Sequence, residues 1–138
     1  MRVETQLSAL IENKAGVLAA LAADLARHGI SVRALTVANL VDHAVLRMVV
    51  SEPRQALHLL GERGILVVSS RVIGVDMPDR AGALAALATK LGRAGVNIDY
   101  AYGSGVPDAG RATLYLHVSD LKKARAALTN GRPRRRTR

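Results

Sequence analysis

Two short segments of the chain place a polar, a basic and a glycine residue directly before an apolar helical pattern. The first reads Asn-Lys-Ala-Gly-Val-Leu over residues 13–18, and the second reads Asp-Arg-Ala-Gly-Ala-Leu over residues 79–84. The first turn of a helix presents unpaired N–H groups and the positive end of the helix dipole, so a carboxylate can dock there. Gly16 and Gly82 let a ligand approach the backbone without an intervening Cβ. Both segments are therefore candidates for binding a small ligand that carries a carboxylate.

The same residues also have an ordinary structural explanation. Asn13 and Asp79 belong to the residue types that cap helices, although either side chain could instead meet an ammonium group of the ligand. Gly16 and Gly82 could serve only the packing of helix against sheet. The two segments by themselves leave both interpretations open.

The sequence offers little support for an enzyme. It has no cysteine, which removes thiolate metal ligands and a cysteine nucleophile. The four histidines (His28, His43, His58 and His117) have no spacing that makes a metal site, and no serine has the surroundings of a nucleophile. The glycine-rich stretch 103–110 lies between two predicted strands, so we expect a hairpin connection rather than a phosphate-binding loop. We predict no catalytic residue, no metal and no cofactor.

Composition and charge point to a soluble protein. The 138 residues contain no run of about 18 apolar residues, and the start of the chain lacks the pattern of a signal peptide, so we expect a cytoplasmic location. Five arginines lie between Arg132 and Arg138, and without them the net charge falls from +9 to +4. The basic excess is thus mostly terminal, and we expect residues 131–138 to form a disordered tail.

An internal repeat organises the chain. Residues 12–32 align with residues 78–98, and the matches include a glycine before and a glycine after a helix of the same length. The coinciding pairs are Ala15 and Ala81, Gly16 and Gly82, Leu18 and Leu84, Leu21 and Leu87, Leu25 and Leu91, Arg27 and Arg93, and Gly29 and Gly95. Further on, Val-Ser-Glu at 50–52 matches Val-Ser-Asp at 118–120, so the second copy carries a two-residue insertion.

Each copy shows the same order of local signals. Alternating apolar residues predict strands, and leucines three and four residues apart predict helices that end near Gly29 and Gly64. The first copy is expected to contain strands at 3–11, 30–38, 43–51 and 65–68, with helices after residue 14 and from Pro53. The second is expected to contain strands at 71–77, 96–103 and 111–119, with helices at 81–93 and 120–128.

This order predicts an α+β fold of two ferredoxin-like βαββαβ modules, each with an antiparallel sheet and both helices on one face. The first module covers residues 1–69 and the second covers residues 70–130, where no clear last strand follows the final helix. The open face of each sheet needs a cover, and a neighbouring module is the natural one.

The quoted segments resemble the ACT family. Residues 11–18 and 29–38 are similar to the ACT domain in the regulatory subunit of acetolactate synthase, and residues 78–84 and 95–98 to the commoner ACT form. The whole pattern up to Leu128 resembles small stand-alone tandem ACT proteins. The resemblance implies an allosteric regulatory protein that binds a free amino acid at the loops between strand 1 and helix 1, at an inter-module interface. It also implies that the start of the second strand of a neighbouring module closes the site.

The resemblance names the expected ligand-binding residues. In the first copy these are Asn13, Lys14, Ala15, Gly16, Val17, Leu18, Ser31 and Val32. In the second copy they are Asp79, Arg80, Ala81, Gly82, Ala83, Leu84, Asn97 and Ile98. Tyr100 and Tyr102 lie two residues apart and so share one sheet face. Packing is their ordinary role, and walls of the ligand pocket are the alternative.

Two other functions compete with this one. RNA-recognition modules share the βαββαβ order, and an arginine-rich tail favours phosphate. RNA-recognition modules, however, stack bases on paired aromatic residues of their central strands. The first copy has no aromatic residue, so nucleic acid is not the expected partner. The second alternative is a structural regulatory subunit that clamps an enzyme without binding a ligand. In either regulatory case we expect a homodimer or other homo-oligomer, with no membrane association.

Overall fold

The fold consists of six strands and four helices in the part of the chain that the structure describes. The computed structural model describes residues 1–105 and 109–129, so the tail predicted for 131–138 lies outside the described residues. The elements are β1 (Arg2–Glu12), α1 (Val17–Arg27), β2 (Val32–Leu40), β3 (His43–Val50), α2 (Pro53–Glu62), β4 (Leu66–Pro78), α3 (Ala83–Arg93), β5 (Ile98–Gly105), β6 (Arg111–Val118) and α4 (Leu121–Thr129). No helix among these residues is long and apolar enough to cross a membrane.

The chain divides into two compact units. We call Glu4–Arg71 the first module, and Met1–Val3 together with the described residues from Val72 onward the second module. The first module orders its strands β2-β3-β1-β4, and β3 is antiparallel to both β1 and β2. The second module orders its strands β4-β6-β5, again with antiparallel pairs. The predicted ferredoxin-like α+β fold is confirmed.

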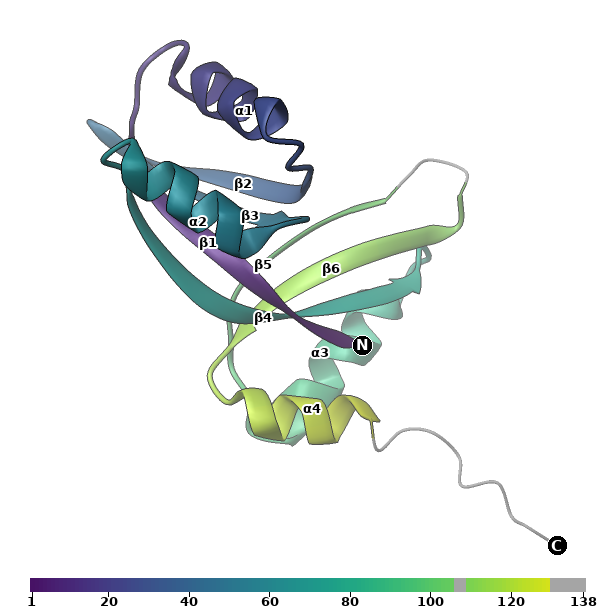
Figure 1. Ribbon diagram of the computed structural model, residues 1–138. Coiled ribbons are helices and arrows are strands. Elements are labelled where there is room, and N and C mark those ends of the chain that lie inside the picture. Colours follow the sequence, from purple (N-terminus) through teal and green to yellow (C-terminus); the bar gives the residue numbers. More distant parts are fainter. Residues whose placement is uncertain (106–108, 130–138) are drawn as a thin grey trace, which may run out of the picture. The chain divides into compact units, whose positions relative to one another are not determined.

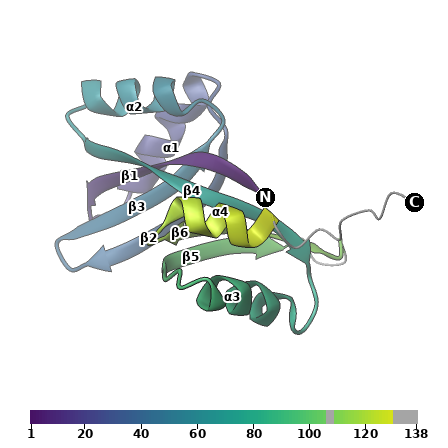
Figure 2. The same ribbon diagram turned by 90° about the horizontal axis from the view of Figure 1, so that it is seen from below.

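The core of the first module lies between one sheet face and the two helices. Leu7, Ala9 and Ile11 alternate along β1 and are buried, as the sequence pattern predicts. Leu21 and Leu25, four residues apart on α1, pack into the same core together with residues of α2. Figure 2 shows α1 and α2 on the same side of the strands of this module.

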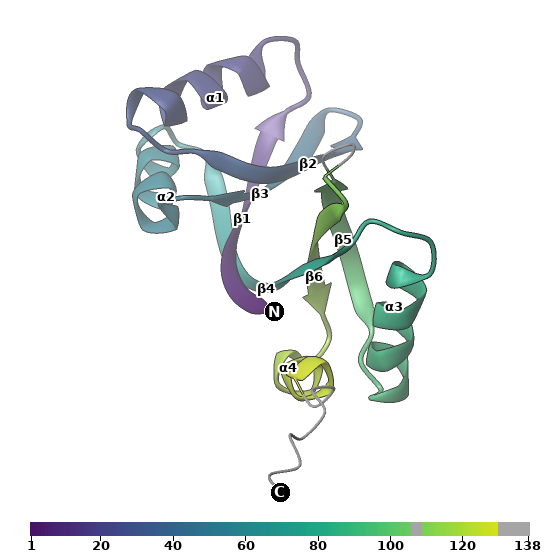
Figure 3. The same cartoon turned by 90° about the vertical axis from the view of Figure 1, so that its right-hand side faces the viewer.

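The second module repeats this arrangement. Leu87 and Leu91 of α3, which correspond to Leu21 and Leu25, pack with Ala124 of α4 against Ile73 and Leu116 of the strands. Figure 3 shows α3 running beside β5. The internal repeat of the sequence therefore corresponds to two cores in which equivalent residues pack in the same way.

β4 differs from the prediction. The sequence predicts two separate strands at 65–68 and 71–77, whereas the structure has one strand from Leu66 to Pro78 (Figure 1). The intervening residues Ser69 and Ser70 are polar and interrupt the apolar pattern, but the backbone stays extended and pairs as a strand. The last strand of the first module is thus continuous with the first strand of the second.

The start of β1 supplies part of the second module. Met1–Val3 belongs to that unit, and β1 is the neighbour of β4 in the strand order. The Nη1 of Arg2 lies 2.8 Å from Oδ2 of Asp76 on β4. Residues of the N-terminus thus lie at the sheet edge where the second copy lacks its own last strand.

Candidate functional site

The β1–α1 loop ends in a glycine that leaves the helix uncapped. Gly16 occupies the N-cap with a φ of 86°, in the left-handed region that favours glycine, and no side chain caps the helix. The N–H of Val17 donates to the carbonyl of Lys14 at 3.3 Å. Within the described residues, the next two amides of the first turn, those of Leu18 and Ala19, have no hydrogen-bond partner. Two N–H donors are thus available at the start of α1, which the basic residue Lys14 precedes in sequence.

The second module has the same loop geometry. Gly82 is the N-cap of α3 with a φ of 91°, and the N–H of Ala83 donates to the carbonyl of Arg80 at 3.3 Å. The amides of Leu84 and Ala85 have no partner within the described residues. Each module therefore offers two amide donors and the positive end of a helix dipole, which together suit a carboxylate.

Helix capping by Asn13 or Asp79, one interpretation of the sequence, is wrong. Asn13 turns away from the helix, and its Nδ2 donates to Oδ1 of Asn39 at 2.8 Å and to the carbonyl of Val41 at 2.9 Å. Both residues tie their loop to a hairpin through the backbone, since the N–H of Asn13 donates to the carbonyl of Asp42 and the N–H of Asp79 to that of Gly110. Their role is to hold the loop in place.

A cavity of about 390 Å³ lies between this loop and the β2–β3 hairpin of the first module. It is lined by Glu12, Asn13, Lys14, Val41, Asp42 and His43. Val41 has a φ of 71°, a left-handed conformation that is rare for a β-branched residue. Its N–H donates to Oδ1 of Asn39 at 2.8 Å, so the same side chain that binds Asn13 also holds the strained turn. The predicted strands at 30–38 and 43–51 imply a turn at this place. The sequence did not indicate that the turn is bonded to the β1–α1 loop.

The starts of the second strands are fixed identically in both modules. The N–H of Ser31 donates to Oγ of Ser51, and the N–H of Ser51 donates to the carbonyl of Ser31, both at 2.9 Å. Asn97 and Ser119 make the same pair of bonds at the same distances. Sequence reasoning did not assign Ser51 and Ser119 this function, although their coincidence in the repeat was a signal for it.

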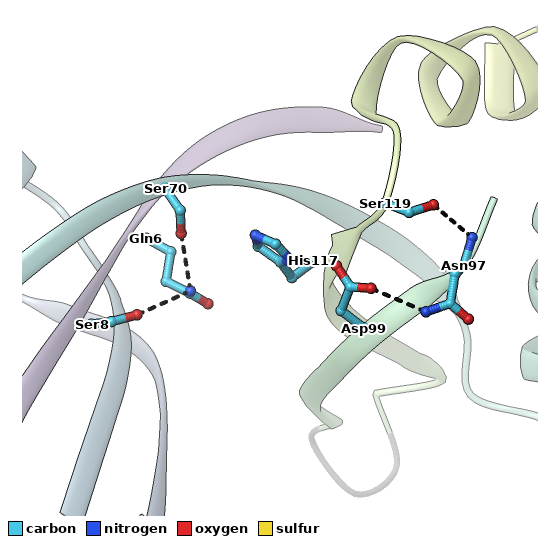
Figure 4. Close-up of polar contacts among 7 residues, drawn as sticks. All are labelled: Gln6, Ser8, Ser70, Asn97, Asp99, His117 and Ser119. Carbon is cyan, nitrogen blue, oxygen red and sulfur yellow. Dashed lines mark hydrogen bonds and ion pairs between the residues drawn. The ribbon is translucent and has the colours of Figure 1, made fainter.

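A polar network follows Asn97 in the second module only. Nδ2 of Asn97 lies 3.0 Å from Oδ1 of Asp99, and Nδ1 of His117 lies 2.9 Å from Oδ2 of the same carboxylate (Figure 4). The hydrogen bonds from Asn97 and His117 lower the pKa of Asp99 below its ordinary value. Because Nδ2 is engaged, Oδ1 of Asn97 remains as an acceptor at the start of β5.

The corresponding position in the first module carries the opposite charge. Arg33 stands where the repeat places Asp99, and its guanidinium lies 3.5 Å from the carboxylate of Glu4. Both positions coincide with irregularities in strand pairing, between Val32 and Ala34 and between Ile98 and Tyr100. The sequence did not single out Asp99, because a cross-strand partner cannot be read through an irregular register.

The aromatic residues stack in pairs across β5 and β6. Tyr100 stacks on His117 with ring centroids 4.8 Å apart, and Tyr102 stacks on Tyr115 at 5.7 Å. Tyr100 and Tyr102 therefore share a sheet face, as predicted. The ring of Tyr100 packs against the histidine that orients Asp99. Among the described residues no group of three or more histidine, aspartate or glutamate side chains could hold a metal ion.

Comparison with known proteins identifies the family. The family model described as an ACT domain pair matches residues 1–130. A crystal structure of a protein from Bacteroides thetaiotaomicron is 32% identical, covers 93% of this chain and 88% of its own, and superposes with a TM-score of 0.87. No curated protein sequence matches the chain. The chain therefore belongs to the family of ACT domain pairs.

More distant structures share the fold. The regulatory subunit of aspartate kinase from Thermus thermophilus, in a ligand-free form, is 18% identical with a TM-score of 0.69, and 94% of each chain is covered. The corresponding subunit from Thermus flavus is 19% identical with a TM-score of 0.66, over 93% of this chain and 90% of that one. At these identities the likeness concerns the arrangement of elements alone.

Proposed function

We propose that this protein is a cytoplasmic, non-enzymatic regulator that binds a free amino acid at the loop preceding the first helix of a module. One observation carries the proposal: each module keeps two amides without a partner among the described residues at a helix N-terminus that follows a left-handed glycine. The ligand carboxylate would accept hydrogen bonds from Leu18 and Ala19, or from Leu84 and Ala85. Binding then favours one packing of the modules, and this difference in affinity transmits the signal.

The second module has the better set of acceptor groups for the ammonium group of an amino acid. The Asn97 side chain is oriented by Asp99, whose carboxylate His117 also holds. An acceptor oxygen and a nearby carboxylate favour a cationic amine. The first module presents Arg33 in the corresponding place, which disfavours one. We therefore expect one favoured site, closed by the start of β5, rather than two equal sites.

We also expect the chain to associate with a second copy of itself through β2. Within the described residues β2 has only β3 as a strand neighbour, so its other edge is open for strand pairing. Leu35 and Val37 on this strand leave 48% and 44% of their surface exposed, and Leu18 on α1 is also exposed. An open strand edge lined by apolar side chains is typical of an interface between identical chains.

A thermal-shift screen against the common amino acids tests the proposal. A ligand at about 100 times its dissociation constant stabilises the folded state by roughly 2.7 kcal/mol. For a chain of this length that corresponds to a rise of about 9 °C in melting temperature. We expect one amino acid, or a chemically related group, to produce such a shift.

Two results would favour the alternatives. If no amino acid at millimolar concentration raises the melting temperature, the alternative of a structural subunit that binds no ligand is favoured. Salt-sensitive binding of an oligonucleotide that survives deletion of residues 132–138 would favour the nucleic-acid function.

A further inference from the structure

A second cavity, of about 600 Å³, lies in the first module beside the first turn of α2. Strands β1 and β4 and the start of the helix form its walls, with the lining residues Thr5, Leu7, Glu52, Pro53, Arg54, Leu57, Ser69, Ser70 and Arg71. None of them belongs to the β1–α1 loop or to the start of β2, so the cavity is separate from the proposed amino-acid site. Its volume falls within the range of about 300–1,000 Å³ that is typical of small-molecule sites.

Two arginines and one glutamate line this cavity. Arg54 comes from the first turn of α2 and Arg71 from β4, so residues distant in sequence line the same cavity. Neither forms an ion pair with any residue in 1–105 or 109–129. By contrast Arg27 and Arg63, elsewhere in the same module, both pair with Asp24. Guanidinium groups bind phosphate and carboxylate through two parallel hydrogen bonds, which makes an oxyanion the natural ligand.

A buried glutamine holds β4 on the sheet face opposite the cavity. Gln6 is fully buried, and its Nε2 donates to Oγ of Ser70 at 3.3 Å and to Oγ of Ser8 at 3.5 Å (Figure 4). Side chains alternate along β4, so Ser69 and Arg71 share the face toward α2 while Ser70 faces the other way. Ser69 and Thr5 supply the hydroxyls of the cavity wall.

Comparison of the two modules shows that Glu52 is not used to cap its helix. At the corresponding position of the second module, Oδ1 of Asp120 accepts the N–H of Lys123 at 3.0 Å. Glu52 makes no such bond to α2, so its carboxylate remains available at the cavity and the amides of Arg54 and Gln55 keep no partner within the described residues. The cavity therefore offers donors for an oxyanion and one carboxylate that can accept from a hydroxyl.

We propose that this cavity binds a small phosphate monoester. Arg54 and Arg71 hold the phosphate with the help of the Ser69 and Thr5 hydroxyls. Leu57 contacts the carbon skeleton of the ligand, and Glu52 accepts a hydrogen bond from one of its hydroxyl groups. Such a site would give the regulator a second input, sensed independently of the amino acid.

An NMR titration of the full chain tests this site residue by residue. The probes are inorganic phosphate and glycerol 3-phosphate, added to the isotopically labelled protein while its amide resonances are followed. We expect the largest shifts at Arg54, Gln55 and residues 69–71, with glycerol 3-phosphate binding more tightly than inorganic phosphate. Arg54→Gln and Arg71→Gln should each weaken binding by about tenfold to a hundredfold, which is the usual effect of losing a charge-assisted hydrogen bond.

Arg93→Gln is the matched control, because it removes the same charge from an exposed helix position that does not line the cavity. It should leave the affinity unchanged, and a well-dispersed amide spectrum shows that each variant is folded. Equal weakening by Arg93→Gln, shifts centred outside the cavity, or no binding of either probe at millimolar concentration would overturn the proposal. Equal affinity for the two probes would overturn the assignment to a monoester.

We expect phosphate binding at the cavity to be independent of the proposed amino-acid site. Variants of Gly16 and Gly82 should keep their affinity for glycerol 3-phosphate. A flat amino-acid screen would leave the titration unaffected, so failure of one proposal is distinguishable from failure of the other.

Discussion

Replacing Gly16 and Gly82 by aspartate should remove amino-acid binding while leaving the fold intact. Both glycines sit at the N-cap with positive φ angles, and a Cβ built at either position meets no atom within 4 Å. The new side chain is therefore accommodated sterically. It places a carboxylate beside the amides that are proposed to receive the carboxylate of the ligand.

The expected magnitudes separate binding from stability. Two unit charges about 5 Å apart in a protein environment of effective dielectric constant near 20 repel each other by roughly 3 kcal/mol, which weakens affinity about 200-fold. A ligand present at about 100 times its dissociation constant would then stabilise the variant by only about 0.2 kcal/mol instead of 2.7 kcal/mol. The left-handed backbone itself costs a non-glycine residue roughly 1–2 kcal/mol, or about 3–7 °C in melting temperature without ligand.

Gly64→Asp separates these two effects. Gly64 follows α2 with a φ of 74°, and a Cβ there also meets nothing within 4 Å. This variant should lose about as much stability as either single substitution and gain one negative charge, as each of them does, yet keep the full ligand-induced shift of about 9 °C. The measurement is thermal unfolding with and without the amino acid found in the screen. If the double variant of Gly16 and Gly82 kept the shift, or if Gly64→Asp lost it too, the carboxylate would not bind at these helix N-termini.

Four further outcomes follow from the packing and the charges. Leu25→Ala should lower the free energy of unfolding by about 3–5 kcal/mol in urea titrations, because the leucine is almost completely buried in the first core. Val41→Gly should raise it by roughly 1 kcal/mol by relieving the positive φ, and a decrease would show that the turn is unstrained. Because the folded state lowers the pKa of Asp99, its carboxylate stabilises the protein at neutral pH, and the advantage of wild type over Asp99→Asn should disappear as the pH falls through the folded-state pKa. If the chain dimerises through β2 as proposed, Leu35→Glu combined with Val37→Glu should yield a monomer in light scattering without a change in helix content, and a mass equal to that of wild type would overturn this interface.

Much of the fold was predictable because local signals and the repeat agree. Gly29 and Gly95 end their helices with positive φ angles, and the amide of the following residue bonds back to Leu25 or Leu91. The alternation in β1 and the leucine spacing in α1 correctly predict the buried residues Leu7 and Leu21. Each of these signals acts within a few residues and so survives in the sequence.

The candidate site was predicted in part. The sequence singled out Gly16 and Gly82, whose conformation follows from the missing side chain. It did not indicate that Asn13 bonds to Asn39 rather than to its helix, because that choice depends on how closely the hairpin approaches. Asp99 stayed unnoticed because its partner His117 lies across an irregular pairing.

The sequence by itself determined the two copies, the order of their elements and the glycines that begin their first helices, since propensity, periodicity and backbone sterics are local. Only the tertiary structure decided that Leu66–Pro78 is one strand, because strand pairing outweighs the polar interruption at Ser69 and Ser70. It likewise placed Met1–Val3 in the second module and brought Arg54 to the same cavity as Arg71. Contacts between residues far apart in the chain depend on how the elements pack, and that packing is set by the whole core rather than by any one segment.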